Sequence, residues 1–436
     1  MLDTLIANVT LVTCNEKMDV LFGAYLGVDQ GKIAYIGTEP PKEQPKTIID
    51  GTGMVAMPGL INCHTHLATT ALRSFTDNVT RAEALEQQLN RQDKLDEESA
   101  RASAMLGIAE CLRFGTTSVS DLYYYTEATA QAVAKSGIKA NLALSCYRFE
   151  DQNEDFDFET DPQCQEQCRL LEKWQDFAGR IRVDAGLYAE YTSNYKLWEG
   201  LAAWAREKGI GLQLHLAETQ KEAEDCLDRT GLGPAQLLDS HNFFVPGTVA
   251  TGCVGLTQEE KKLLGKRKVS AVATPVAYAK AGLPGVDILS AVQAGMNVAL
   301  GTGGANECGN LDMFRVMRKV AMDARILGGD ADKMPAQAAL MMATSCGAAA
   351  QGRADTTGML KVGMDADVIL VDFSAPHLIP CHDVMSALVF SASGSDVAMT
   401  MVQGEILYQS GNFLTVDLAD TVNQIMQNTI PRLFKE

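Results

Sequence analysis

The chain has 436 residues, which suits one large barrel or two to three ordinary domains. It carries 37 Lys and Arg against 55 Asp and Glu, a net charge of −18, so nucleic acids and anionic membranes would repel it. No apolar run reaches the roughly 18 residues that span a bilayer. Hydrophobic residues make up 46% and charged residues 21%, which excludes a disordered chain.

The cysteines and the first residues predict where the protein works. The 11 cysteines are an odd number without a repeated spacing. Residues 1–14 have neither the basic segment nor the long apolar run of a signal peptide. We therefore expect reduced, buried thiols in a cytoplasmic protein.

Both ends of the chain are predicted to form short strands. Alternating or β-branched apolar residues occur in six segments, 5–14, 24–37, 47–59, 359–373, 386–394 and 397–411. The two ends could pair into one small sheet domain. We therefore divide the chain into the N-terminal part of a β-sandwich (1–55), a middle domain (56–360), and the C-terminal part of the sandwich with a terminal helix (361–436).

The middle of the chain alternates strands and helices. Eight strand-like runs are Val55–His64, Thr116–Leu122, Ile138–Cys146, Ile181–Tyr191, Ile210–Leu216, Thr248–Val254, Val269–Pro275 and Met296–Thr302. Helical spacing of apolar residues occurs in Asp96–Phe114, Thr126–Ser136, Tyr195–Lys208, Thr219–Arg229, Gln258–Arg267, Ile288–Ala294 and Leu311–Leu327. Eight strands, each followed by helical sequence, predict a (β/α)8 TIM barrel. A doubly wound open sheet is the alternative, but residues 62–66 lack its glycine fingerprint.

Two histidines at the end of the first barrel strand give the sharpest local signal. His64 and His66 are two residues apart, so their side chains point to the same face of a strand. The C-terminal ends of barrel strands carry the active site, and two imidazoles there make half of a metal site. The competing interpretation is a pair of ordinary, hydrogen-bonded histidines.

His215 and Glu218 complete the candidate site. His215 ends the fifth strand, so a barrel would bring it across from His64 and His66. Glu218 follows three residues later, within reach of the same mouth. A carboxylate beside a metal-activated water can take its proton and pass it to a leaving nitrogen. The four residues together predict metal-dependent hydrolysis.

The segment Pro58–His66 resembles the first-strand motif of the amidohydrolase superfamily. Almost the whole chain is similar to the branch that contains methylthioadenosine/S-adenosylhomocysteine deaminases, guanine and cytosine deaminases, and triazine hydrolases. Further matching stretches are Phe114–Thr117, His215–Thr219, Gly295–Thr302, Leu311–Phe314 and Gly363–Asp367. The resemblance implies a barrel with a β-sandwich formed by both termini.

The resemblance also implies roles for the site residues. His64, His66 and His215 would bind one divalent ion, zinc or iron, and Glu218 would shuttle protons. The substrate would be a purine, a pyrimidine or a related heterocycle, cleaved at a C–N bond. Assembly into a homo-oligomer is also implied, since relatives often form dimers or larger assemblies.

Two residues of the family pattern are replaced by glycine. The pattern places a histidine that polarises the substrate at the end of strand six, where this chain has Gly252. It places a metal-binding aspartate at the end of strand eight, where this chain has Gly303. Asn306, Glu307 and Cys308 follow the glycines of the eighth loop, and Cys253 is next to Gly252. A Cys or Glu there could bind the metal from a shifted position, and the competing interpretation is loop residues that face solvent or substrate.

Three further residues are candidates for substrate binding. Glu83 matches a family position that contacts ribose hydroxyls, and Arg148 lies near a position that holds the substrate tail. Tyr188 belongs to a mouth segment in which the family carries a histidine. Glu83 and Arg148 could equally be exposed charged residues of a helix or a loop.

The sequence leaves three functions open. The favoured one is an atypical amidohydrolase that deaminates a heterocycle. The alternative, suggested by Gly252 and Gly303, is a catalytically silent protein that binds a ligand or an active partner subunit. A lyase or isomerase that uses the same cavity is the third.

Overall fold

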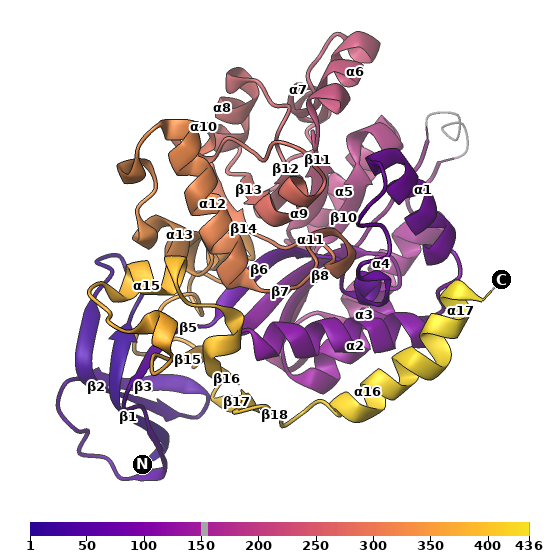
Figure 1. Cartoon of the computed structure of the whole chain (residues 1–436). Helices are drawn as coiled ribbons and strands as arrows, with labels where there is room; N and C mark the ends of the chain where they lie inside the picture. The colour runs from indigo at the N-terminus through magenta and orange to yellow at the C-terminus, as the bar shows by residue number, and fades with distance from the viewer. Residues whose placement is uncertain (150–155, 436) are drawn as a thin grey trace.

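A parallel barrel forms the centre of the protein, whose computed structural model describes residues 1–149 and 156–435 (Figure 1). The barrel strands pair in sequence order. They are β6 (Leu60–Thr65), β7 (Thr116–Tyr123), β8 (Lys139–Leu144), β9 (Ile181–Val183), β10 (Ala185–Ala189), β11 (Leu212–Leu216), β12 (Thr248–Gly252), β13 (Ser270–Ala273) and β14 (Asn297–Leu300). Parallel bridges between Cys146 and Leu187 and between Thr65 and Gly303 join the two hydrogen-bonded halves. The predicted (β/α)8 barrel is confirmed, with β9 and β10 sharing one strand position.

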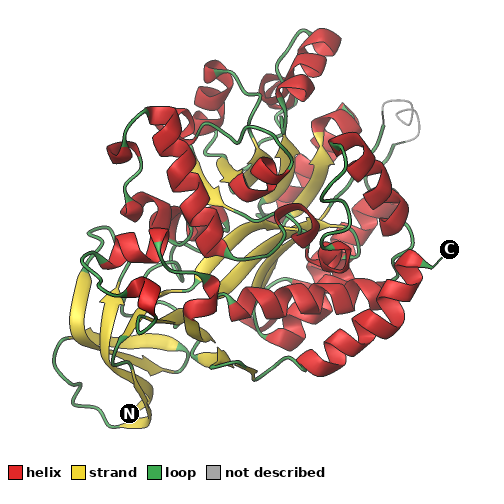
Figure 2. Cartoon of the chain, viewed as in Figure 1, coloured by secondary structure: helices red, strands yellow, loops and turns green. Residues whose placement is uncertain are grey.

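Helices surround the barrel strands, as Figure 2 shows. They are α1 (Arg81–Gln92), α2 (Glu97–Arg113), α3 (Thr126–Ser136), α4 (Pro162–Trp174), α5 (Tyr195–Lys208), α6 (Gln220–Thr230), α7 (Pro234–Ser240), α8 (Gln258–Lys266), α9 (Pro275–Lys280), α10 (Ile288–Gln293), α11 (Ala305–Cys308), α12 (Met313–Gly328), α13 (Ala336–Met342), α14 (Ser345–Ala350) and α15 (Val384–Phe390). Local capping sets several of these bounds. The side chain of Asn194 accepts from the backbone N–H of Leu197 and starts α5, and Gly209 ends it in a left-handed conformation.

The predicted strand Val55–His64 is two strands in the structure. β5 (Met54–Pro58) pairs with strands from both ends of the chain, whereas β6 enters the barrel. Gly59 separates them, and a Cβ there would lie 2.1 Å from Cγ2 of Thr117. Only glycine allows this close approach of the chain to β7.

The chain ends form one branched nine-stranded sheet (Figure 1). Besides β5 it contains β1 (Leu2–Val12), β2 (Val20–Asp29), β3 (Lys32–Gly37), β4 (Pro45–Asp50), β15 (Val368–Asp372), β16 (Val397–Val402), β17 (Glu405–Gln409) and β18 (Asn412–Phe413). The predicted small β domain from both termini is therefore present. The ranges 1–55, 56–360 and 361–436 stay our proposal for the domain division, and β5 crosses the first boundary.

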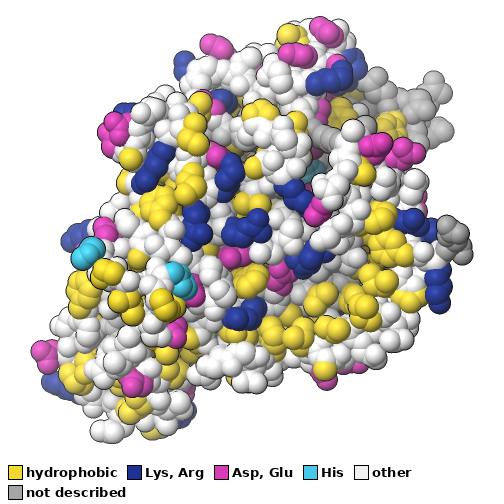
Figure 3. Space-filling view, in the orientation of Figure 1, with side chains coloured by type: hydrophobic (Ala, Val, Ile, Leu, Met, Phe, Trp, Pro, Cys, Tyr) yellow, Lys and Arg dark blue, Asp and Glu magenta, His cyan; other side chains and the backbone are white. Residues whose placement is uncertain are grey.

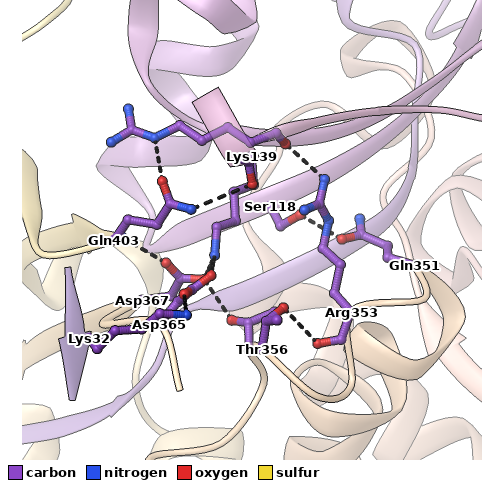
Figure 4. A network of polar contacts seen from close by, with 12 residues as sticks. Lys32, Ser118, Lys139, Gln351, Arg353, Thr356, Asp365, Asp367 and Gln403 are labelled. Carbon is purple, nitrogen blue, oxygen red and sulfur yellow. Dashed lines mark hydrogen bonds and ion pairs between the residues drawn. The ribbon is translucent and has the colours of Figure 1, made fainter. Parts of the chain in front are cut away.

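A buried polar network connects the β domain to the end of the barrel at which the strands begin (Figure 4). Lys139, the first residue of β8, is completely buried. Its Nζ lies 2.6 Å from a carboxylate oxygen of Asp365 and 2.5 Å from one of Asp367. Asp365 also pairs with Lys32 from β3, and Thr357 donates a hydrogen bond to Asp367. This paired charge cluster fixes the two parts of the protein to each other.

The C-terminal helices lie on the barrel and not on the terminal sheet. α16 (Leu418–Gln424) packs against α2, and α17 (Ile430–Phe434) follows it (Figure 1). Hydrophobic side chains gather along this part of the surface, where Leu418, Val422 and Met426 are exposed (Figure 3). None of the helices in the described ranges is long and apolar enough to cross a membrane.

Candidate metal centre

Three histidines meet at the C-terminal ends of the barrel strands. β6 carries His64, with His66 directly after it, and β11 carries His215. One ring nitrogen from each lies within 4.8 Å of the other two, and Nε2 of His64 is 3.3 Å from Nε2 of His215. The barrel thus brings together residues that are about 150 positions apart in the chain, as the sequence predicted.

Backbone carbonyls orient two of the imidazole rings. Nδ1 of His66 lies 2.8 Å from the carbonyl oxygen of Leu122, and Nδ1 of His215 lies 2.8 Å from that of Tyr188. A carbonyl can only accept, so each Nδ1 is the protonated nitrogen and each Nε2 keeps its lone pair. Burial lowers the pKa of His64 and His215, and neighbouring imidazoles add to this at His64. The rings of His64 and His215 are therefore neutral at pH 7, the form that binds metal.

The spacing of these nitrogens fits a tetrahedral cation. Two imidazole nitrogens at about 2.0–2.1 Å from a tetrahedral zinc ion lie about 3.3–3.4 Å apart. The observed separation between His64 and His215 is 3.3 Å. Carbonyl contacts on the outer nitrogens are the usual support of metal-binding histidines. The three residues can hold one divalent cation, and imidazole alone suits zinc and iron alike.

A cavity of about 280 Å³ opens over the three histidines. This volume lies just below the usual range for small-molecule sites, about 300–1,000 Å³. Its lining includes five tyrosines, Tyr123, Tyr124, Tyr188, Tyr191 and Tyr278, together with Glu218 and Glu307. Aromatic rings and a few polar groups around a metal-binding cluster suit a flat, polar heterocycle.

Glu218 and Tyr188 reach the cavity as the sequence predicted. Glu218 follows the end of β11 and lines the cavity together with His215. The ring of Tyr188 lies 5.3 Å from that of His215, centroid to centroid. Burial raises the pKa of Tyr188, and the charge of Glu218 adds to this effect, so its hydroxyl is a neutral donor at pH 7.

Glu83 and Arg148 do not line the cavity. Glu83 is exposed, and its carboxylate accepts a hydrogen bond from the backbone N–H of Thr80, which caps α1. Arg148 forms an ion pair with Asp161 at 2.9 Å and lies over the ring of Phe156. In this structure both side chains have structural roles.

The two glycines that replace expected side chains have left-handed backbones. Gly252 has φ +103°, and a Cβ there would lie 2.9 Å from the carbonyl oxygen of Leu216 and 3.1 Å from Cγ of Glu218. Gly303 has φ +70° and lines the cavity. Cys253 and Cys308 are buried outside the cavity lining, and burial raises the pKa of each thiol to about 12. Neither thiol substitutes for the missing side chains.

Two residues of β7 that lie at the site were not predicted from the sequence. Tyr123 ends this strand beside His66, and among the described residues its buried hydroxyl has no hydrogen-bond partner. Asp121 accepts hydrogen bonds from the N–H of Leu67 at 2.7 Å and from the hydroxyl of Thr65 at 3.0 Å. It therefore fixes the turn that carries His66. The signal was available, because residues 121–125 include the last residues of a predicted strand and those directly after it, at the active end of a barrel.

Comparison with known proteins agrees with this architecture. The model of the amidohydrolase family matches residues 55–407. The 5'-deoxyadenosine deaminase of Methanosarcina mazei is 35% identical over 419 residues, 96% of this chain and 95% of the relative. The 5-methylthioadenosine/S-adenosylhomocysteine deaminase of Moorella thermoacetica is 34% identical over 405 residues, 92% and 93% of the two chains.

A solved structure is similar along its whole length. An adenosine deaminase from Xanthomonas campestris, crystallised with bound zinc, superposes with a TM-score of 0.92 at 27% sequence identity. The match covers 99% of this chain and 98% of that one. With a family model that matches most of the sequence and relatives that match almost all of it, the chain belongs to the amidohydrolase family.

Proposed function

We propose that this protein is a metal-dependent deaminase that hydrolyses the exocyclic C–N bond of a purine, with a 5'-substituted adenosine as its substrate. The observation that carries the proposal is the cluster of three imidazoles with Glu218 at the mouth of the same barrel. The relatives named as deaminases of 5'-deoxyadenosine and methylthioadenosine support this choice of substrate.

His64, His66 and His215 would hold the cation, which zinc fits by the spacing of their nitrogens. When bound, such a cation lowers the pKa of water to about 7 and stabilises negative charge as it develops. The other tasks belong to the residues of this chain. The carbonyl oxygens of Leu122 and Tyr188 keep two of the rings in the required tautomer.

Glu218 would carry the proton of the reaction. Its carboxylate accepts a proton from water while the water oxygen bonds to the ring carbon that bears the amino group. The same proton then passes to the leaving nitrogen, whose bond to carbon breaks. The hydroxyl proton that remains moves to the adjacent ring nitrogen as the carbonyl forms. The sum is amine plus water giving a carbonyl and ammonia, without any oxidant or reductant.

Tyrosines would hold the heterocycle over this site. Tyr188 and Tyr123 lie beside His215 and His66, with ring centroids 5.3 and 5.7 Å away. Their rings can stack on a flat base, and their neutral hydroxyls can donate to its ring nitrogens. Because neither hydroxyl is charged at pH 7, the cavity suits an uncharged base.

Ammonia release tests the proposal directly. Purified protein loaded with zinc should release ammonia from 5'-deoxyadenosine, methylthioadenosine or adenosine, whereas a His64→Ala/His66→Ala variant should not. Elemental analysis should find about one metal ion per native chain and none in the variant. A native protein that binds zinc but releases no ammonia from any purine would refute the proposal.

The second candidate is a silent ligand-binding protein, favoured by Gly252. This position has no side chain, and with φ +103° and Leu216 and Glu218 in contact range an added side chain would be strained. A silent protein would bind the nucleoside without turnover, which calorimetry can show. We also expect a homo-oligomer in the cytoplasm, and light scattering of the purified protein tests the oligomeric state.

A further inference from the structure

A second carboxylate stands at the end of the barrel strand where Gly303 leaves a gap. α11 begins two residues after this glycine, at Ala305, and Glu307 is its third residue. Oε2 of Glu307 accepts a hydrogen bond from the N–H of Gly304 at 2.9 Å. A Cβ built on Gly303 would lie 2.3 Å from that oxygen. The carboxylate therefore already fills the space into which a side chain at position 303 would extend.

This carboxylate is tied to the strand that carries the histidines. The N–H groups of Thr302 and Gly303 both donate to the carbonyl oxygen of His64, at 3.2 and 3.0 Å. Gly303 also forms a parallel bridge with Thr65, the residue between the two histidines. The segment that leads into α11 is thus held against β6, and Glu307 lines the same cavity as Glu218.

The charge of Glu307 acts across the cavity. Burial is the main cause that raises the pKa of both Tyr123 and Tyr188, and the negative charge of Glu307 raises each further. These tyrosines belong to different strands, β7 and β10. Glu307 lines the same cavity as both tyrosines and the three histidines.

We propose that Glu307 is the second functional carboxylate of this site: it accepts a hydrogen bond from the attacking water and supplies negative charge that holds the cation. The inference rests on the proposed function. It assigns to Glu307 of α11 the role of the carboxylate that the family pattern places at position 303. In the described part of the chain, the group with ligand atoms mutually within 4.8 Å contains only histidines. Glu307 therefore acts through water and not as a direct ligand.

Zinc affinity and turnover of Glu307→Gln test the proposal. Loss of a carboxylate that supports a metal site typically weakens metal binding about 10–100-fold. Loss of one group that stabilises the transition state lowers kcat by about 10²–10³-fold. We expect both effects, with KM changed less than threefold. Competition with a chelating dye measures zinc affinity independently of activity.

Two further variants separate this role from the capping role. Glu260 makes the same capping contact with Thr257 on α8, outside the cavity lining, so Glu260→Gln should keep native zinc affinity. Gly303→Asp/Glu307→Ala returns a carboxylate from the strand end, and aspartate tolerates the left-handed backbone there better than most residues. This double variant should bind zinc at least tenfold more tightly than Glu307→Ala.

The outcomes distinguish the two proposals. Native zinc affinity and kcat in Glu307→Gln would overturn the assignment of Glu307 even if the native protein is an active deaminase. A native protein without deaminase activity, combined with weakened zinc binding in Glu307→Gln, would refute the proposed function and support the assignment. A native protein that binds no zinc would refute both.

Discussion

Replacing Lys139 by methionine is expected to destabilise the protein by about 3 kcal/mol, because it leaves buried carboxylates without their cation. Lys139 is completely buried between Asp365 and Asp367. Removing one partner of a buried ion pair costs about 3–5 kcal/mol. Asp365 keeps its ion pair with Lys32, which places the expected loss at the lower end of this range.

The assay is thermal unfolding with a matched exposed pair as control. For a large domain about 1 kcal/mol shifts the midpoint by roughly 2–4 °C, so Lys139→Met should unfold about 6–12 °C below the native protein. Lys46 pairs with Asp3 at the surface, and Lys46→Met should leave the midpoint unchanged. Equal midpoints for the native protein and Lys139→Met would refute the reasoning.

The sign of the pH dependence gives a second check. Burial alone would raise the pKa of Asp365, but Lys139 and Lys32 outweigh it and lower the pKa below 3.8. A lowered carboxyl pKa stabilises the folded state above the unfolded pKa, and this stabilisation is lost as the pH falls through the folded pKa. The difference between the native protein and Lys139→Met should therefore be largest near pH 7 and shrink below pH 4.

Three further results are expected. Zinc at 100 times its dissociation constant should stabilise the native protein by about 2.7 kcal/mol, and thermal unfolding should show no such shift in His64→Ala/His66→Ala. Gly252→Ala should lower the unfolding midpoint more than Gly231→Ala, because both positions are left-handed but only the Cβ at 252 meets other atoms within 4 Å; equal midpoints would contradict this. Burial raises the pKa of Asp184 above 3.8, so the ionised carboxylate disfavours folding as the pH rises through this region. Denaturation between pH 4 and 7 should show Asp184→Asn becoming more stable relative to the native protein as the pH rises.

Helix bounds could be predicted where local residues decide them. α3 and α5 begin and end at the predicted residues, because Gly137 and Gly209 end them in the left-handed conformation that only glycine adopts easily. The split at Gly59 could not be predicted, since both strands are equally apolar. The close approach of Thr117, which requires the glycine, exists only in the folded barrel.

The sequence predicts those site residues whose positions depend on the barrel topology alone. Strand ends of a parallel barrel meet, so the positions of His64, His66 and His215 followed from their places in the strands. Glu83 lies on a helix between strands, where sequence does not tell which face turns inward, and its carboxylate caps α1. Tyr123 was overlooked because an aromatic residue at a strand end is as typical of a core as of a binding site.

The two glycines at the mouth have different consequences, although the sequence shows the same change at both. At Gly303 the place of the side chain is taken by Oε2 of Glu307, 2.3 Å from where a Cβ would lie. At Gly252 a Cβ would meet Leu216 and Glu218, and φ +103° is a conformation that other residues rarely adopt. A carboxylate group therefore occupies the first position, whereas this chain has no imidazole at the second. An enzyme built this way must polarise its substrate with the cation and its tyrosines, so the rate should depend more on the metal than on a fourth histidine.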